Sequence, residues 1–219
     1  MKKLFLYGAG SVGREVFDIA DRINTSESRW GEIAFIDDTQ ETGIFQGKRV
    51  FQYCDFVKLF SPDEVEIAIT NGEPIARKAL YEKVRSDGYQ LANVVDKTAI
   101  VSPSAQLGEG VIVYPFVMIS SDSKIGDNVL IYCQTTVAHD SIIGEGSVLS
   151  IGVIVSGNCT ISKYCFIGAG ATIREKIEIG EWNIIAMSSG VCKSVSQNGI
   201  YMGNPAKRVK ENTTRRVFK

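Results

Sequence analysis

Residues 125–149 read IGDNVLIYCQTTVAHDSIIGEGSVL, and every sixth residue of this stretch is a branched aliphatic. The same register continues in both directions without a slip and covers sixteen positions. These are Val101, Leu107, Val113, Ile119, Ile125, Ile131, Val137, Ile143, Leu149, Val155, Ile161, Ile167, Ile173, Ile179, Ile185 and Val191. A fixed six-residue period over this length is typical of a parallel β-helix.

The position four residues after each aliphatic is small or β-branched in nearly every repeat, as at Thr135, Ser141 and Ser147. Side chains alternate along a strand, so a small residue, an outward residue and an aliphatic make a short strand with two inward side chains. The three residues that follow, often Gly-Glu-Gly or Gly-Asp-Asn, have turn chemistry. Three strands and three corners therefore close one triangular coil.

The composition gives little reason to expect a polyanionic partner. The 219 residues include 24 basic and 25 acidic side chains, and the net charge is −1. We therefore expect neither nucleic-acid binding nor attachment to an anionic membrane. The five cysteines lack metal or redox spacing, and the apolar run after Lys3 is too short for a signal peptide or a membrane span. These features predict a cytoplasmic protein that holds no metal.

A smaller α/β pattern precedes the repeat. We predict strands at residues 3–7, 33–36, 65–69 and 91–95, with helices from about 12 to 23 and from about 74 to 86. This is a Rossmann-like half domain, too short for the two halves that hold NAD. The predicted domains are residues 1–98, the Rossmann-like domain, and residues 99–219, the β-helix with its C-terminal tail.

A glycine turn links the first strand to the first helix. Residues 8–13 read GAGSVG, so Gly8, Gly10 and Ser11 can bring backbone amides and a helix N-terminus toward a phosphate. Asp37, at the end of the second strand, can accept hydrogen bonds from a ribose or a base. The alternative is that the glycines only make a tight turn and that Asp37 is a solvated strand end.

His139 is the single histidine of the chain. It lies two residues after the aliphatic Val137, in the corner 138–140, so its side chain is expected to point outward. A lone surface histidine can be an idle solvated side chain. The neighbouring Asp140 favours a functional interpretation, because a carboxylate can fix the imidazole tautomer and increase its basicity.

These motifs together resemble one family. Residues 137–140 read VAHD and residues 203–207 read GNPAK, and both follow a short domain with a GxGxxG turn. The chain resembles hexapeptide-repeat acyltransferases with a left-handed β-helix, especially sugar acetyltransferases of the sialic acid O-acetyltransferase and bacillosamine-pathway N-acetyltransferase group. The resemblance covers essentially the whole chain. The left-handed sense is implied by this likeness alone, since general connection rules favour right-handed crossovers.

The resemblance implies a homotrimer that binds acetyl-CoA between neighbouring β-helices. His139 would be the general base that deprotonates the attacking amine or hydroxyl, and Asp140 would orient it. Gly157, one coil beyond His139, would leave room for pantetheine and offer its amide to the thioester oxygen.

The remaining cofactor contacts implied by the resemblance are a narrow stretch at Gly168, Ala169 and Gly170 and two lysines, Lys193 and Lys207, for the CoA phosphates. Either lysine can equally be an ordinary solvated side chain. The N-terminal domain would hold the UDP part of an amino sugar through Gly8, Gly10 and Asp37, together with Ser11 of the same turn.

The chain also departs from the family pattern. Ala138 replaces the asparagine that often precedes the histidine, and Val148 stands where many relatives have a second histidine. Tyr132 occupies a position where asparagine is common, and Arg14 lies in a segment that is frequently Gly-His or Gly-Lys. These differences bear on the acceptor sugar more than on the class of reaction.

Three functions are compatible with these residues. The first is acetyl transfer to the amino group of a nucleotide-linked sugar, and the second is O-acetylation of sialic acid or another sugar. Both need the same base, so the nucleotide preference of the first domain must distinguish them. The third is a non-catalytic β-helix that senses a nucleotide. A trimeric zinc carbonic anhydrase is disfavoured, because such sites need three histidines.

Overall fold

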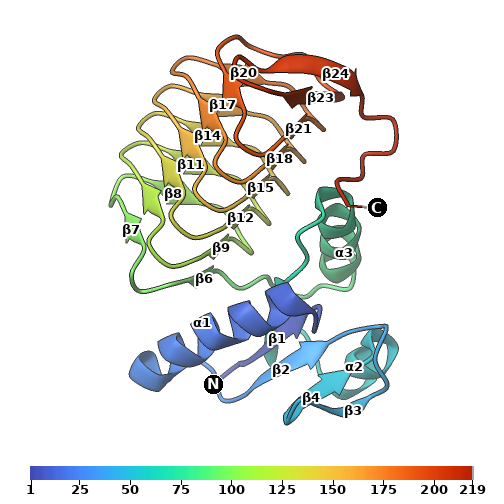
Figure 1. Ribbon diagram of the computed structural model, residues 1–219. Coiled ribbons are helices and arrows are strands. Elements are labelled where there is room, and N and C mark those ends of the chain that lie inside the picture. Colours follow the sequence, from blue (N-terminus) through green and yellow to red (C-terminus); the bar gives the residue numbers. More distant parts are fainter. Residues whose placement is uncertain (219) are drawn as a thin grey trace.

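The computed structural model describes residues 1–218 and has the predicted fold class, an α/β domain followed by a left-handed parallel β-helix (Figure 1). The first domain is built around a five-stranded sheet in the order β3-β4-β2-β1-β5. Its elements are β1 (Lys3–Tyr7), α1 (Ser11–Glu27), β2 (Ile33–Ile36), β3 (Gly43–Phe45), β4 (Lys48–Phe51), α2 (Tyr53–Leu59), β5 (Val65–Ile69) and α3 (Pro74–Ser86).

The two faces of this sheet are separate hydrophobic clusters. Side chains of β1 alternate between them: Leu4 and Leu6 pack with helix α1, whereas Phe5 and Tyr7 pack with α2 and α3. This alternation is the reason that the predicted strand 3–7 is apolar at every position from Leu4 onward. Because both faces of the sheet are covered, β1 is the buried centre of the domain.

The predictions for the first domain were partly confirmed. Strands β1, β2 and β5 and helix α3 have the predicted bounds, and α1 extends to Glu27, beyond the predicted end at residue 23. The segment with β3, β4 and α2 was missed. The predicted strand 91–95 was wrong as one element: Leu91 bridges to Ile67, and the separate strand β6 (Val94–Val95) pairs with the β-helix. The β-helix ladder therefore begins ahead of the predicted domain boundary.

The coils of the β-helix form three sheets of two-residue strands, in which each strand pairs in parallel with the strand 18 residues away, and the longer strands β23 (Gly199–Met202) and β24 (Lys207–Glu211) extend one of these sheets. The first sheet, which we call face B, contains β6, β9 (Ile112–Val113), β12 (Leu130–Ile131), β15 (Val148–Leu149), β18 (Phe166–Ile167) and β21 (Ile184–Ile185). Face C contains β7 (Ile100–Val101), β10 (Met118–Ile119), β13 (Thr136–Val137), β16 (Ile154–Val155), β19 (Thr172–Ile173) and β22 (Gly190–Val191). Face D contains β8 (Gln106–Leu107), β11 (Lys124–Ile125), β14 (Ile142–Ile143), β17 (Thr160–Ile161) and β20 (Glu178–Ile179).

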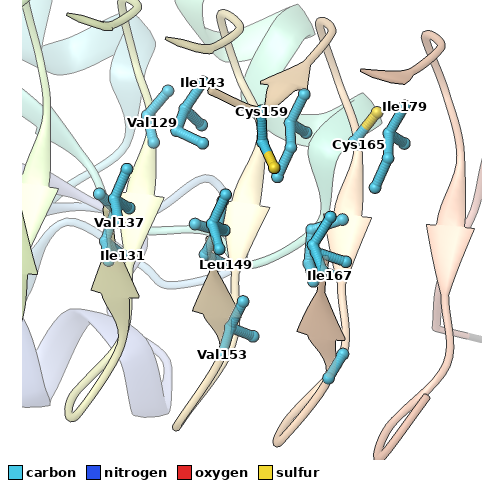
Figure 2. Packing of buried hydrophobic residues seen from close by; sticks show 14 of the residues in the cluster. Val129, Ile131, Val137, Ile143, Leu149, Val153, Cys159, Cys165, Ile167 and Ile179 are labelled. Atoms are coloured by element: carbon cyan, nitrogen blue, oxygen red, sulfur yellow. The ribbon is translucent and has the colours of Figure 1, made fainter. Parts of the chain in front are cut away.

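The predicted inward positions form the core of this prism (Figure 2). Ile131, Val137 and Ile143, one from each face, are completely buried. Cys159 and Cys165 occupy inward small positions and are equally buried, as expected for small hydrophobic side chains. Burial raises the pKa of the Cys165 thiol to about 12, which makes it an unreactive core residue.

The three faces meet different surroundings. The outward residues of face B, including Ile112, Leu130 and Val148, are buried beneath helix α1. The outward residues of face D include Lys124 and Glu178, which suit solvent. Face C instead presents Ile100, Met118 and Ile154 to solvent. The chain on its own therefore leaves one apolar face uncovered.

Helix α3 is fastened to the corner between faces D and B through one row of side chains. Arg77, Tyr81 and Arg85 lie four residues apart, so they share one helix face. Tyr81 donates to Asp127 (3.1 Å), and Arg85 pairs with Glu109 (2.8 Å). These contacts hold α3 beside the coils, where Figure 1 shows the helix.

Arg77 is the buried member of that row. Its guanidinium donates to the carbonyl and the side-chain oxygen of Asn128, both at 2.6 Å from Nη2, and also to the carbonyls of Ile69 and Asn71. Asn128 donates back to the Arg77 carbonyl at 3.0 Å. Burial lowers the pKa of Arg77 to about 9, so the group stays charged at neutral pH and depends on these oxygens.

Replacing Ile143 with aspartate should unfold the β-helix or lower its free energy of unfolding by more than about 4 kcal/mol, because it buries an unpaired charge. The matched control is Ile142→Asp at the neighbouring outward position, where the side chain is 43% exposed. This variant should keep near-normal stability. Urea unfolding measures both, and equal stabilities would contradict the register.

Candidate functional site

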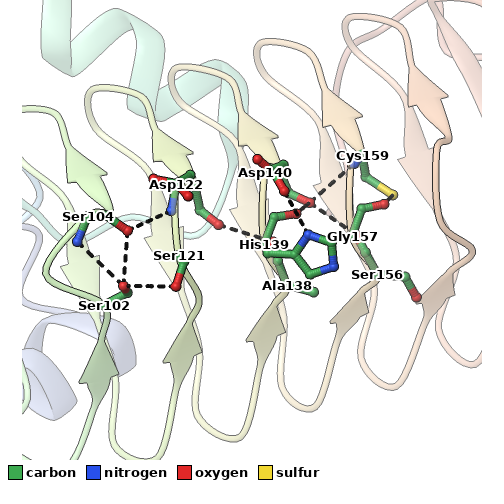
Figure 3. A network of polar contacts seen from close by, with 12 residues as sticks. Ser102, Ser104, Ser121, Asp122, Ala138, His139, Asp140, Ser156, Gly157 and Cys159 are labelled. Carbon is green, nitrogen blue, oxygen red and sulfur yellow. Dashed lines mark hydrogen bonds and ion pairs between the residues drawn. The ribbon is translucent and has the colours of Figure 1, made fainter.

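The corner between β13 and β14 carries an exposed pair of polar side chains, His139 and Asp140. The Nδ1 atom of His139 lies 2.8 Å from a carboxylate oxygen of Asp140 (Figure 3). Adjacent residues on a flat strand point to opposite faces, but Asp140 has a left-handed backbone with φ of 56°, which turns its side chain toward the histidine. A proton shared with Asp140 at Nδ1 leaves the lone pair of Nε2 free to accept another.

Gly157 lies directly against the imidazole from the next coil (Figure 3). A Cβ atom at Gly157 would come within 2.6 Å of Nε2, so glycine is needed for the ring to occupy this position. The coils are held in register here by the Asn158 amide, which donates to the His139 carbonyl at 3.0 Å. Gly157 is itself buried beside the imidazole, and its N–H has no partner within the described part of the chain.

The other predicted cofactor residues lie at different places on the prism. Lys193 follows β22 in the same column of corners as His139 and Gly157, three coils or roughly 14 Å beyond the histidine. Gly168, Ala169 and Gly170 form the corner between β18 and β19, at the opposite edge of face C. Lys207 begins β24 (Lys207–Glu211), which pairs with β23 (Gly199–Met202) on face B. One chain therefore does not gather all six predicted cofactor residues around His139.

A cavity of about 620 Å³ opens where the first domain meets the β-helix and the C-terminal tail. It brings together all four predicted substrate-binding residues, Gly8, Gly10, Ser11 and Asp37. The other lining residues are Tyr7, Val12, Asp38, Thr39, Thr70, Asn71, Gly72, Glu73, Leu80, Tyr132 and Phe218. Strands β1, β2 and β5 all end at this cavity, the usual place for a ligand on a parallel sheet.

The glycine turn is shaped by close backbone contacts. Gly8 has φ of 118° and its added Cβ would lie 2.8 Å from the Thr70 carbonyl oxygen, so no other residue fits there without strain. At Gly13 an added Cβ would lie 1.9 Å from the Gly8 carbonyl oxygen. At Gly10, which precedes α1, no atom lies within 4 Å of an added Cβ. The cavity side of the turn is therefore open, next to first-turn amides that the helix itself leaves unpaired.

Asp37 has a structural role that the sequence did not predict. One carboxylate oxygen accepts from the Ala9 amide at 2.7 Å, which fixes the glycine turn to the end of β2. The other accepts from the Thr39 amide and hydroxyl. Only the oxygen paired with Ala9 retains room for another donor, such as a ribose hydroxyl.

Sequence reasoning missed Asp38, although it follows Asp37 directly. Burial opposes ionisation of Asp38, but hydrogen bonds from the Tyr7 hydroxyl (2.6 Å) and the Tyr53 amide (2.8 Å) hold the pKa of this carboxyl below its usual value. Burial also raises the pKa of Tyr132, another missed residue of the cavity, to about 12. Phe218 gave no signal in the sequence, because only the fold brings it to the cavity.

The comparisons with known proteins agree with this architecture. Residues 3–84 match the family model described as the PglD N-terminal domain. The acetyltransferase domain of PglB from Neisseria gonorrhoeae FA1090 is 28% identical, with a TM-score of 0.89 over 95% of this chain and 100% of that chain. The same domain has been solved in complex with acetyl coenzyme A. The chain resembles the hexapeptide-repeat sugar acetyltransferases over nearly its whole length.

Two further relatives support the same resemblance. WeeI from Acinetobacter baumannii AYE is 28% identical, with a TM-score of 0.88 over 95% of this chain and 100% of that chain. PerB from Caulobacter crescentus, solved in complex with CoA and GDP-perosamine, is 25% identical, with a TM-score of 0.87 over 96% of this chain and 98% of that chain. The family resemblance predicted from the sequence motifs is thus confirmed.

Within residues 1–218 no helix has both the length and the apolar character needed to cross a bilayer. The same part of the chain contains no group of three or more His, Cys, Asp or Glu side chains arranged to hold a metal ion.

The two glycines flanking the start of α1 should respond differently to valine. Gly13→Val places its side chain against the Gly8 carbonyl and should lower the free energy of unfolding by about 3 kcal/mol or more. Gly10→Val meets open space and should lower it by about 1 kcal/mol or less. Chemical denaturation of the two variants measures this difference, and the reverse order would contradict the described turn.

Proposed function

We propose that this protein is an acetyl-CoA-dependent N-acetyltransferase that acts on the amino group of a UDP-linked amino sugar. The observation that carries the proposal is the His139–Asp140 contact of 2.8 Å, with Nε2 facing the glycine of the next coil. Relatives with the same fold bind acetyl coenzyme A or CoA, and PerB was solved with a nucleotide-linked amino sugar. Acetyl-CoA and reduced thiols are both normal in the cytoplasm, where we place the reaction.

The chemistry follows from the free nitrogen of His139. Nε2 removes a proton from the sugar amine as its nitrogen attacks the thioester carbonyl, so a C–N bond forms. The Gly157 amide donates to the oxygen that becomes negatively charged. The intermediate collapses by breaking the C–S bond, and the proton held by the imidazole passes to the departing CoA sulfur. Asp140 holds the ring in the required tautomer throughout.

Face C supports a homotrimer. Its exposed residues Ile100, Met118 and Ile154, with Thr136 between the last two, form a largely apolar stripe that a second and third copy would cover around a closed axis. In such a ring one edge of face C meets the opposite edge in the next copy. The corner with His139 would then face the corner with Gly168, Ala169 and Gly170 of the neighbouring copy.

That geometry gives the scattered cofactor residues a shared role. In the cleft between copies, CoA would extend from His139 along its column of corners toward Lys193, whose charge suits the phosphates. Gly168–Gly170 would form the opposite wall of the cleft, and Lys207 would approach from the top of the β-helix. A long cofactor is better buried between two subunits than on one flat face.

The cavity between the domains would hold the nucleotide sugar. The turn at Gly8, Gly10 and Ser11 with the start of α1 suits a diphosphate, and Asp37 suits a ribose hydroxyl. Tyr132 lines the cavity and directly follows β12 of face B. It therefore begins the corner between faces B and C, which would meet the neighbouring copy. A sugar at the Tyr132 end of the cavity would therefore point toward the partner's histidine corner.

His139→Ala should lower kcat by about 10²–10⁴-fold, while the affinities for acetyl-CoA and the nucleotide sugar stay near normal. Asp140→Asn keeps the shape of the side chain but weakens its hydrogen bond to the imidazole, so it should lower kcat by a smaller factor. The measurement is a steady-state assay over UDP-, GDP- and TDP-linked amino sugars, with calorimetry for binding. A His139→Ala protein that keeps most of its kcat would contradict the proposed base.

The same panel separates the competing functions. Turnover of a UDP-linked amino sugar supports the proposal, whereas acetylation of free or CMP-linked sialic acid would support the O-acetyltransferase alternative. Nucleotide binding without any acetyl-CoA binding would indicate a non-catalytic sensor.

The oligomer prediction is tested on two exposed isoleucines. Ile154, on face C, and Ile142, on face D, are 46% and 43% exposed, so their substitution should affect the isolated chain similarly. Ile154→Asp should reduce a trimer to smaller species because it places charges in the proposed interface, while Ile142→Asp should leave it intact. Light scattering measures both, and a monomeric wild-type protein at micromolar concentration would contradict the trimer.

A further inference from the structure

The segment after β24 returns from the top of the β-helix to the first domain (Figure 1). It is attached at several points. The Asn212 side chain donates to the Trp182 carbonyl at 2.8 Å, and the Arg215 guanidinium lies 4.6 Å from the centre of the Trp182 ring. These contacts direct the following residues along the side of the prism next to α3.

Further along, the segment is hydrogen-bonded to Glu73, the residue before α3. The Val217 amide donates to both Glu73 carboxylate oxygens, at 2.9 and 3.1 Å, and the Phe218 amide donates to one of them at 2.9 Å. Glu73 makes no side-chain cap at its own helix. Its carboxylate is thus committed to the tail, and the two amides compensate a negative charge at the edge of the nucleotide cavity.

This attachment puts the Phe218 ring in the cavity wall. The ring packs edge-on against Phe166 of face B, with 5.6 Å between centroids, yet remains 56% exposed. It lines the cavity together with Gly72, Glu73 and Tyr132. An aromatic ring held on one side and open on the other offers apolar surface to a ligand.

The order of the strands indicates which part of the ligand meets this wall. Strand β1, which leads into the glycine turn, lies between β2 and β5. A diphosphate at the turn would therefore have Asp37, after β2, on one side and Gly72 and Glu73, after β5, on the other. If Asp37 meets the ribose, the sugar lies on the side of Glu73 and Phe218.

We propose that Phe218 is a specificity-determining residue that packs against the sugar of the bound nucleotide sugar, and that Glu73 is the positioning residue that holds it there. This inference rests on the proposed function. It adds a substrate contact from Phe218, which lies 145 residues after Glu73 in the sequence.

The test compares UDP with a UDP-linked 4-amino sugar as calorimetric probes. Phe218→Ala should weaken binding of the sugar nucleotide by about tenfold and binding of UDP by about twofold or less, since only the sugar loses a contact. Glu73→Gln should act in the same direction with a smaller effect. It should also speed hydrogen exchange of the tail amides in the unliganded protein, because they lose a charged acceptor.

Val209→Ala is the matched control, a half-exposed apolar side chain on β24 that does not line the cavity. It should leave both affinities unchanged. Equal sugar-nucleotide affinity in Phe218→Ala and wild type, or an equal loss for both probes, would overturn the assignment of Phe218 to the sugar. Failure of the wild-type protein to bind either probe would overturn the UDP-type function itself, and this inference with it.

Discussion

The geometry of the β-helix depends on one backbone constraint, a left-handed residue at the third position of each corner from residue 110 to residue 188. From residue 110 to residue 188, every sixth residue has φ between 55° and 69°. Only some of these are glycines, and the series includes Phe116 and Trp182. An L-residue in this conformation costs about 1–2 kcal/mol, so the closure of each coil and its stacking on the next must stabilise the strained corners. The constraint keeps the aliphatic layers in register.

The same constraint brings Asp140 into contact with His139. Asp140 is the left-handed residue of its corner, and this conformation directs its carboxylate to the imidazole next to it in sequence. The pair is nevertheless exposed in the isolated chain. Electrostatic stabilisation is weaker in water than in a closed site, so a cleft that excludes solvent would benefit the base that we propose here. The uncovered apolar face beside it provides a physical reason for such a cleft to form between copies.

The first domain is attached to the β-helix through face B and through helix α3. Face B is covered by α1, which joins the first domain to the outer side of the β-helix in one hydrophobic cluster. Arg77 fixes the orientation of α3 because its buried charge needs the oxygens of Asn128, Ile69 and Asn71 together. The cavity at the glycine turn is lined from both domains, so the contacts of Arg77 at this junction help to set the position of its walls.

The sequence by itself determined the β-helix register, the outward position of His139 and the glycine turn, because each follows from local periodicity or from turn chemistry. It also predicted β1, β2, β5 and α3, whose apolar patterns are strong. It did not determine β3, β4 and α2, where exposed positions and short lengths leave no clear period, or the division of residues 91–95 between two sheets. The hydrogen bonds of Asp37, the burial of Arg77 and the arrival of Phe218 at the cavity were decided only by the tertiary structure. Each depends on a partner far away in sequence, and local patterns carry no information about such partners.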